Sequence, residues 1–270
     1  MLNMSFSNNE NPDGGLTAGL QKGVILHNEG TPLCEEGMGF GVPVIVNRYG
    51  TYLSFTADLE EQERNGSRYY IKTFYMDALQ RAKTGGKEIE SDLRYRWIEA
   101  RGWVYKRFPL VQRFLPVALT ARRKAGVEFF FKKVDPPAIV RVLYRIGQDN
   151  IDIEIDHQGS IRAGGSARLY ILNEQGAGVF DNYSDSSGAD LKKSAIGGWI
   201  NVDADKAWMM CKDKMIGFAV NNHPRIPLYR GWEKASDTLS WSGFIYDLTK
   251  SGRESFAYRI EVIGKKTGEA

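Results

Sequence analysis

The side chains best suited to chemistry gather in one loop-like stretch between two expected strands. The stretch contains His223, Arg225, Tyr229, Arg230 and Trp232. An imidazole transfers protons near neutral pH, guanidinium groups bind carboxylates, and aromatic rings stack on the faces of sugar rings. Loops carried by a rigid β-scaffold are frequent positions for binding sites. These residues therefore predict a site that binds or transforms a sugar or a uronate.

If the protein is an enzyme, a lyase, hydrolase or epimerase step needs a general acid and a general base. Glu35 and Glu36 lie beside a glycine-rich turn, Gly37–Gly41, and one of them could act as a general acid or base. We predict His223 and Glu35 as catalytic residues, with Arg225 and Arg230 holding an anionic group and Tyr229 or Trp232 stacking on the ring. The alternative is that Tyr229 and Trp232 plug the end of a β-sandwich and that the charges are solvated.

The sequence lacks the usual patterns for metals and nucleotides. Its histidines, His27, His157 and His223, are far apart and show no zinc-ligand spacing. Gly37–Gly41 lacks the dinucleotide-binding spacing and precedes a strand instead of a helix. We therefore expect no metal site and no cofactor. A net charge of only +3 also makes nucleic acid an improbable partner for the chain as a whole.

The clearest structural element is a β-hairpin from Ala138 to His157. Two alternating runs flank Gly147–Asn150, which has the composition of a tight turn. Pairing across this turn places the isoleucines and valines on one face, which we assign to the core. On the other face, Arg145 lies opposite Asp152 and Arg141 lies opposite Asp156. The acidic row Asp152, Glu154 and Asp156 is thus interpreted as a cross-strand charge ladder and not as a metal site.

Strand-like runs separated by short turns continue on both sides of a different segment, residues 90–125. The pattern predicts a mainly β fold, a large antiparallel β-sandwich, with a short helical insertion at about 90–125. Helical spacing at Leu93, Trp97, Ala100 and Val104 supports the insertion, and Pro109 and Pro116 interrupt it. We expect a flexible N-terminus at 1–15 and a single domain at 16–270.

The insertion mixes aromatic and basic residues between Arg101 and Arg123. This mixture supports two alternatives to sugar chemistry. The first is a non-catalytic interaction module, in which the segment contacts a membrane surface or another partner. The second is an enzyme for a hydrophobic small molecule, such as a lipid or isoprenoid, with the segment lining the pocket. A helical insertion that packs on the sandwich with its basic stems in solvent is the simpler reading.

Trp208–Val220 resembles a hairpin of the galactose-mutarotase-like supersandwich proteins. In that family an aromatic residue leads a strand that turns at an acidic residue and returns through Gly-x-Ala-Val. Here the matching positions are Trp208, Asp213, Gly217, Phe218, Ala219 and Val220. The resemblance implies a supersandwich fold and a role like that of aldose epimerases, polysaccharide lyases or glycoside-hydrolase accessory domains. The catalytic motifs of the mutarotases do not stand out, so no catalytic residue is carried over.

The remaining features concern the cellular compartment. Cys34 and Cys211 are the only cysteines, and their separation favours free thiols over a disulfide framework. The first residues are polar and do not resemble a signal peptide, and no run has the length of a membrane span. We therefore expect a soluble, cytoplasmic protein without a transmembrane segment.

Overall fold

The computed structural model describes most of the chain. The described residues are 2–6, 19–28, 31–32, 38–47, 49–64, 66–89, 103–104, 107–108, 111, 114, 117, 121, 124–157, 167–174, 179–211, 215–224, 226–234, 240–249 and 255–264. The strands are β1 (Leu2–Phe6), β2 (Val24–Asn28), β3 (Thr31–Pro32), β4 (Gly39–Asn47), β5 (Gly50–Leu53), β6 (Thr56–Arg64), β7 (Ser67–Thr84), β8 (Lys87–Ile89), β9 (Glu128–Ile146), β10 (Asn150–Asp156), β11 (Arg168–Glu174), β12 (Asn182–Asp185), β13 (Asp190–Lys192), β14 (Ile200–Asn201), β15 (Lys206–Cys211), β16 (Ile216–Asn221), β17 (Leu228–Lys234), β18 (Ser240–Asp247) and β19 (Ser255–Ile263). A short 3₁₀ turn, Lys193–Ala195, follows β13.

Alternating hydrophobicity explains why these segments are strands. In β19, Phe256, Tyr258 and Ile260 are buried, whereas Ala257 and Arg259 between them are exposed. Successive side chains of a strand point to opposite faces, so this pattern places one face in the core and the other in solvent.

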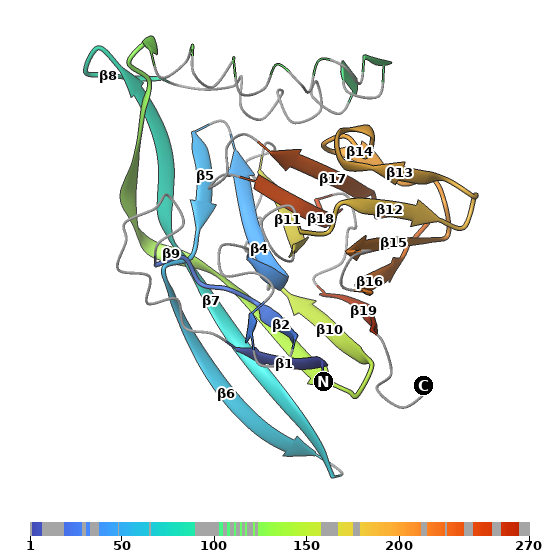
Figure 1. The fold of residues 1–270 in the computed structure, drawn as a ribbon. Coiled ribbons are helices and arrows are strands. Elements are labelled where there is room, and N and C mark those ends of the chain that lie inside the picture. Colours follow the sequence, from blue (N-terminus) through green and yellow to red (C-terminus); the bar gives the residue numbers. More distant parts are fainter. Residues whose placement is uncertain are drawn as a thin grey trace.

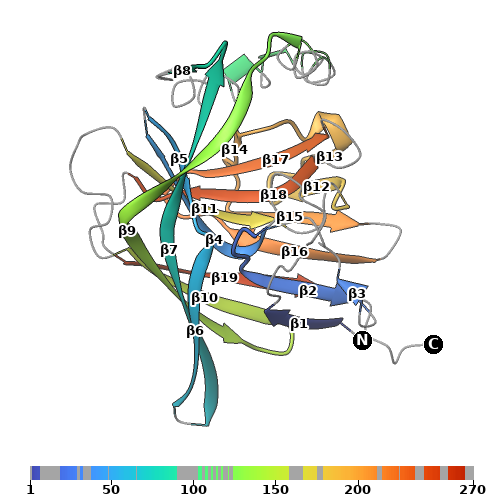
Figure 2. The same ribbon diagram turned by 90° about the vertical axis from the view of Figure 1, so that its left-hand side faces the viewer.

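The strands form two layers that face each other (Figures 1 and 2). One layer has the order β13-β12-β15-β16-β19-β10-β9-β7, and the other has the order β5-β4-β11-β18-β17-β14. Every pairing is antiparallel, and β7 also pairs with β5, which joins the layers. The prediction of a mainly β, antiparallel sandwich-like fold is confirmed.

Aromatic side chains fill the space between the layers. Phe218 of β16 lies 5.0 Å from Phe40 of β4 and 5.8 Å from Phe244 of β18, measured between ring centroids. Tyr258 of β19 and Tyr246 of β18 approach to 4.8 Å. These edge-on and tilted contacts connect strands of opposite layers, so the two layers share one core.

The predicted hairpin forms β9 and β10 with the expected register. Arg145 pairs with Asp152, Leu143 with Glu154, and Arg141 with Asp156. The core face is as predicted, because the isoleucines of β10 and the valines of β9 are buried. Strand β9 extends beyond the hairpin: it starts at Glu128 and continues through Pro136 and Pro137 without ending. Its ladder with β7 is interrupted only between Met76 and Ala78, opposite the prolines, which lack N–H donors.

Strands also form in two segments where none was expected. Leu2–Phe6 form β1, which pairs with β2, and the rest of the predicted flexible N-terminus lies outside the described residues. Strand β6 was not anticipated; it pairs along its length with β7. Within residues 90–125, the described residues Trp103, Val104, Arg107, Val117, Ala121 and Lys124 have helical backbone; the bounds of the insertion stay a prediction.

Candidate functional site

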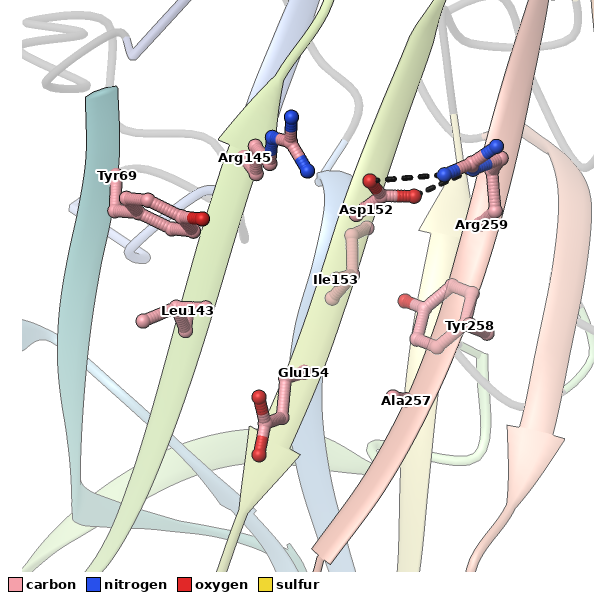
Figure 3. A pocket seen from close by; sticks show the side chains of 9 residues that line it. All are labelled: Tyr69, Leu143, Arg145, Asp152, Ile153, Glu154, Ala257, Tyr258 and Arg259. Carbon is pink, nitrogen blue, oxygen red and sulfur yellow. Dashed lines mark hydrogen bonds and ion pairs between the residues drawn. The ribbon is translucent and has the colours of Figure 1, made fainter. Parts of the chain in front are cut away.

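A shallow open depression lies on the outer face of the layer that contains β7, β9, β10 and β19. Its volume is about 440 Å³. We call it the outer-face depression. Its lining residues are Tyr69, Leu143, Arg145, Asp152, Ile153, Glu154, Ala257, Tyr258 and Arg259 (Figure 3).

The register of the strands explains how the depression forms. One row of outward side chains crosses the sheet as Arg145, Asp152 and Arg259. The neighbouring row is Leu143, Glu154 and Ala257. The short apolar side chains of the second row flank Glu154 and leave room beside the longer side chains of the first row. Ile153 and Tyr258 are buried on the core side, so their side chains do not enter the depression.

An ion pair stiffens one wall. Asp152 accepts hydrogen bonds from Nε and Nη2 of Arg259, and the second bond is 3.0 Å long. This two-point contact fixes the orientation of both side chains better than a single contact would. The pair is half-exposed, so its contribution to stability is small. Its main effect is to hold the carboxylate of Asp152 in place.

Arg145, which was predicted to pair with Asp152, does not form the ion pair with it. The register with Arg145 is correct, but the guanidinium that binds Asp152 comes from the other neighbouring strand, β19. Within the described part of the chain, neither Arg145 nor Glu154 forms an ion pair. Both side chains are exposed at the depression, and Figure 3 shows Arg145 on the strand between Tyr69 and Asp152. Among the described residues, the depression therefore presents one cation, Arg145, and one carboxylate, Glu154, that are not in an ion pair.

The described residues of the predicted site lie in a different part of the molecule. His223 follows β16, and its ring packs edge-on against Phe256 at 5.0 Å and near Tyr246 at 6.0 Å. Burial lowers the pKa of this histidine. Glu35 and Arg225 lie outside the described residues, so catalysis by His223 and Glu35 stays a prediction.

The three predicted binding residues of β17 do not line one surface. Arg230 donates from Nε to the carbonyl of Ile196 at 3.0 Å, and its guanidinium lies 4.4 Å from the ring centroid of Tyr183. Trp232 packs against the main core. Tyr229 points to the opposite face, as strand alternation requires. A single ligand therefore does not reach Tyr229 together with Arg230 and Trp232 on this strand.

Tyr229 belongs instead to an aromatic patch on the outer face of the second layer. Trp199 is the centre of this patch: its ring centroid lies 5.5 Å from Tyr170, 6.4 Å from Tyr229 and 5.8 Å from Trp241. Trp199 has a left-handed backbone with φ of 60°, which is uncommon for a bulky residue. Gly231 lies under Trp241, since a Cβ at that position would be 1.9 Å from the indole ring.

A buried carboxyl group lies next to the glycine-rich turn. Glu174 ends β11 opposite Gly39, and burial raises its pKa to about 8 despite a hydrogen bond from the Met38 N–H and the nearby charge of Lys22. Lys72 donates to the carbonyl of Lys22 at 2.8 Å, and burial lowers its pKa to about 8. The sequence suggested Glu35 as the acidic group at this turn. Glu174 was missed because only the pairing of β11 with β4 brings it there.

Metal-binding groups and membrane-spanning helices can be assessed for the described residues. In the described ranges, no group of three or more histidine, cysteine, aspartate or glutamate side chains is arranged to hold a metal ion. Among the same residues, no helix has the length and apolar character needed to cross a membrane.

Comparison with known proteins leaves the family open. No protein-family model matches the sequence, and no curated protein matches it. One solved structure that aligns with the fold is that of the Slr1438 protein from Synechocystis sp. PCC 6803, with 10% sequence identity. The alignment covers 98% of this chain and 92% of that chain, with a TM-score of 0.29. A score this low does not establish a shared fold, so nothing is inferred from this neighbour.

Proposed function

We propose that the protein binds an acidic sugar of the uronate class in the outer-face depression. The observation that carries the proposal is the uncommitted guanidinium of Arg145 at the edge of an open, partly apolar hollow. A uronate combines a carboxylate with hydroxyl groups and an apolar ring face. The depression offers a complementary group for each of these features.

Arg145 is the group that would hold the carboxylate. A guanidinium binds a carboxylate through two parallel N–H···O bonds, which gives both strength and orientation. Arg259 is less available for this role because Asp152 already occupies it. The resulting division is simple: Arg259 positions a protein carboxylate, and Arg145 binds the carboxylate of the ligand.

The remaining contacts would come from the ring of Tyr69 and from the carboxylates of Glu154 and Asp152. Tyr69 is half-buried at the edge of the depression, where its ring can pack on the apolar face of a sugar. Glu154 and Asp152 accept hydrogen bonds from hydroxyl groups. Leu143 and Ala257 form an apolar floor. With about 440 Å³ of open space, the depression has the dimensions of a small-ligand site.

The resemblance of Trp208–Val220 to galactose-mutarotase-like proteins supports a sugar as the ligand class. If a reaction follows binding, that resemblance implies an epimerase, lyase or hydrolase step. The groups of the depression serve in this proposal as binding groups only. A catalytic role of His223 with Glu35, and substrate contacts from Arg225, Tyr229, Arg230 and Trp232, remain separate predictions.

The test is ligand binding with matched arginine variants. Isothermal titration with galacturonate, glucuronate and glucose is expected to give binding to the uronates and much weaker binding to glucose. Arg145→Ala should weaken uronate binding by about tenfold or more, because it removes a charged hydrogen-bonded contact. Arg141→Ala is the control, since Arg141 is exposed on the same strand and face but does not line the depression.

A second pair of variants tests the location without changing charge. Ala257→Phe fills the floor of the depression and is expected to abolish uronate binding. Ser255→Phe places the same side chain two residues away on the same face, outside the depression, and should leave binding unchanged. Equal binding by the parent protein and Ala257→Phe would refute the proposed site.

A further inference from the structure

The segment from Trp103 to Lys124 has an unusual surface. Several of its described apolar side chains are exposed to solvent: Trp103 is 61% exposed, Phe114 63% and Val117 62%. Phe108 and Val111 are also exposed, at 53% and 42%. Monomeric proteins rarely leave a contiguous row of such residues in water without a binding role.

The spacing shows that these side chains share one face. The described residues of the segment are Trp103, Val104, Arg107, Phe108, Val111, Phe114, Val117, Ala121 and Lys124. Seven exposed residues lie three or four positions apart, which is the period of one side of a helix: Trp103, Arg107, Val111, Phe114, Val117, Ala121 and Lys124. Phe108 N–H donates to the carbonyl of Val104, and Ala125 N–H to that of Ala121, so helical turns form near both ends. We call this row the exposed apolar face.

The charge of the same segment points to the kind of partner. From residue 100 to residue 127 the sequence contains no aspartate or glutamate. Over that range it contains the basic residues Arg101, Lys106, Arg107, Arg113, Arg122, Arg123 and Lys124. An uninterrupted positive charge next to exposed tryptophan and phenylalanine complements a surface that is anionic outside and apolar beneath. An anionic lipid bilayer has this structure.

Local contacts suit residence at such an interface. The guanidinium carbon of Arg107 lies 5.9 Å from the ring centroid of Trp103, so a cation and an amphipathic ring are held together at the surface. Thr84 Oγ1 donates to the carbonyl of Ala125 at 3.2 Å, which ties the end of the segment to the turn between β7 and β8. Figures 1 and 2 show the described parts of the segment at the same end of the molecule as β8.

We propose that the exposed apolar face docks the protein on an anionic membrane surface. Trp103, Phe108, Val111, Phe114 and Val117 enter the boundary between headgroups and acyl chains, and the basic side chains contact lipid phosphates. The protein lies on the bilayer and does not cross it. This inference concerns a different surface from the outer-face depression and does not depend on uronate binding.

The experiment is co-sedimentation of the full chain with lipid vesicles. Vesicles of phosphatidylcholine are compared with vesicles that also contain phosphatidylglycerol, at 50 and 500 mM NaCl. We expect binding to the anionic vesicles at low salt, a loss of about tenfold or more at high salt, and weak binding to the neutral vesicles. Absence of binding to anionic vesicles at low salt would overturn the proposal.

Two sets of variants separate the apolar and the electrostatic contributions. Phe114→Ser with Val117→Ser should lower vesicle binding by about tenfold or more, because apolar area no longer enters the bilayer. Leu59→Ser with Met215→Ser is the control, since both residues are exposed apolar side chains elsewhere. Arg107→Glu with Lys124→Glu should lower binding by a similar factor, whereas Arg68→Glu with Lys192→Glu should not. Circular dichroism checks that all variants remain folded.

The same variants distinguish a membrane from a protein partner. Analytical ultracentrifugation of the parent chain is expected to show a monomer that Phe114→Ser with Val117→Ser does not change. A dimer that these substitutions dissociate would overturn the proposal, because a second copy would then cover the face. Unchanged vesicle binding by the serine variant would overturn it as well.

Discussion

Single residues in this protein depend on contacts that the local sequence does not contain. Asp152 and Arg145 were expected to pair, and their strand register agrees with that expectation. The ion pair nevertheless forms with Arg259, which is more than a hundred residues away along the chain. Nothing in the sequence around Asp152 indicates that β19 lies beside β10. Only the pairing of β10 with β19 therefore explains why Asp152 binds Arg259 and not Arg145.

Glu174 gives a prediction of pH-dependent stability. Burial raises the pKa of its carboxyl from 4.5 to about 8 in the fold. Below about pH 4.5 the group is protonated in both states; as pH rises toward 8, only the unfolded state ionises, so the stability contributed by the neutral carboxyl is lost. Glu174→Gln should resemble the parent protein near pH 4.5 and be more stable by about 1 kcal/mol or more at pH 9.

Thermal unfolding of both proteins from pH 4.5 to 9 measures this effect. Glu154→Gln is a suitable control because Glu154 is exposed. A stability difference between Glu174→Gln and the parent that does not change with pH would show that the carboxyl ionises normally in the folded state.

At the scale of elements, the sequence predicted strands well where apolar residues alternate. The register of β9 and β10 could be deduced to the residue because a shift by one position would expose the isoleucines. Strand β6 was missed because Glu60, Glu61 and Glu63 leave it without an apolar face, as suits a solvated edge strand. In β17, strand alternation places Tyr229 on the opposite face from Arg230 and Trp232, so at most one of the two aromatic residues can stack on a ligand held by Arg230.

The contact of β17 with β18 gives a prediction about packing. Gly231 pairs with Gly243, and a Cβ on Gly231 would lie 1.9 Å from the indole of Trp241. Gly231→Ala should therefore displace this ring and destabilise the fold by about 1–3 kcal/mol. Adding Trp241→Phe should recover part of the loss, since the smaller ring leaves space.

A double-mutant cycle of Gly231→Ala and Trp241→Phe, measured by urea unfolding, checks the coupling. Simple addition of the two effects would show that the glycine is not required to make room for the tryptophan.

At the scale of the whole molecule, the two layers depend on a shared aromatic core. The ring of Phe218 contacts Phe40, Phe180 and Phe244, which come from different parts of the chain. Its removal should therefore weaken both layers at once. We predict that Phe218→Ala lowers the free energy of unfolding by about 3–5 kcal/mol.

Urea unfolding followed by tryptophan fluorescence and by far-ultraviolet circular dichroism measures this loss. The two probes should report one coincident transition, both for the parent protein and for Phe218→Ala. Separate transitions would mean that the layers unfold independently and that Phe218 does not connect them.

The central claim is that Arg145 binds the carboxylate of a uronate, and nuclear magnetic resonance of the arginine Nε–H groups tests it most directly. The Arg145 signal is assigned as the one that is missing from the spectrum of Arg145→Ala. Titration of ¹⁵N-labelled parent protein with galacturonate should shift this signal. The signal of Arg141, on the same strand and face, should stay in place. A saturable shift of Arg145 alone is the predicted result. No shift of Arg145 at galacturonate concentrations that saturate binding by calorimetry would contradict the account.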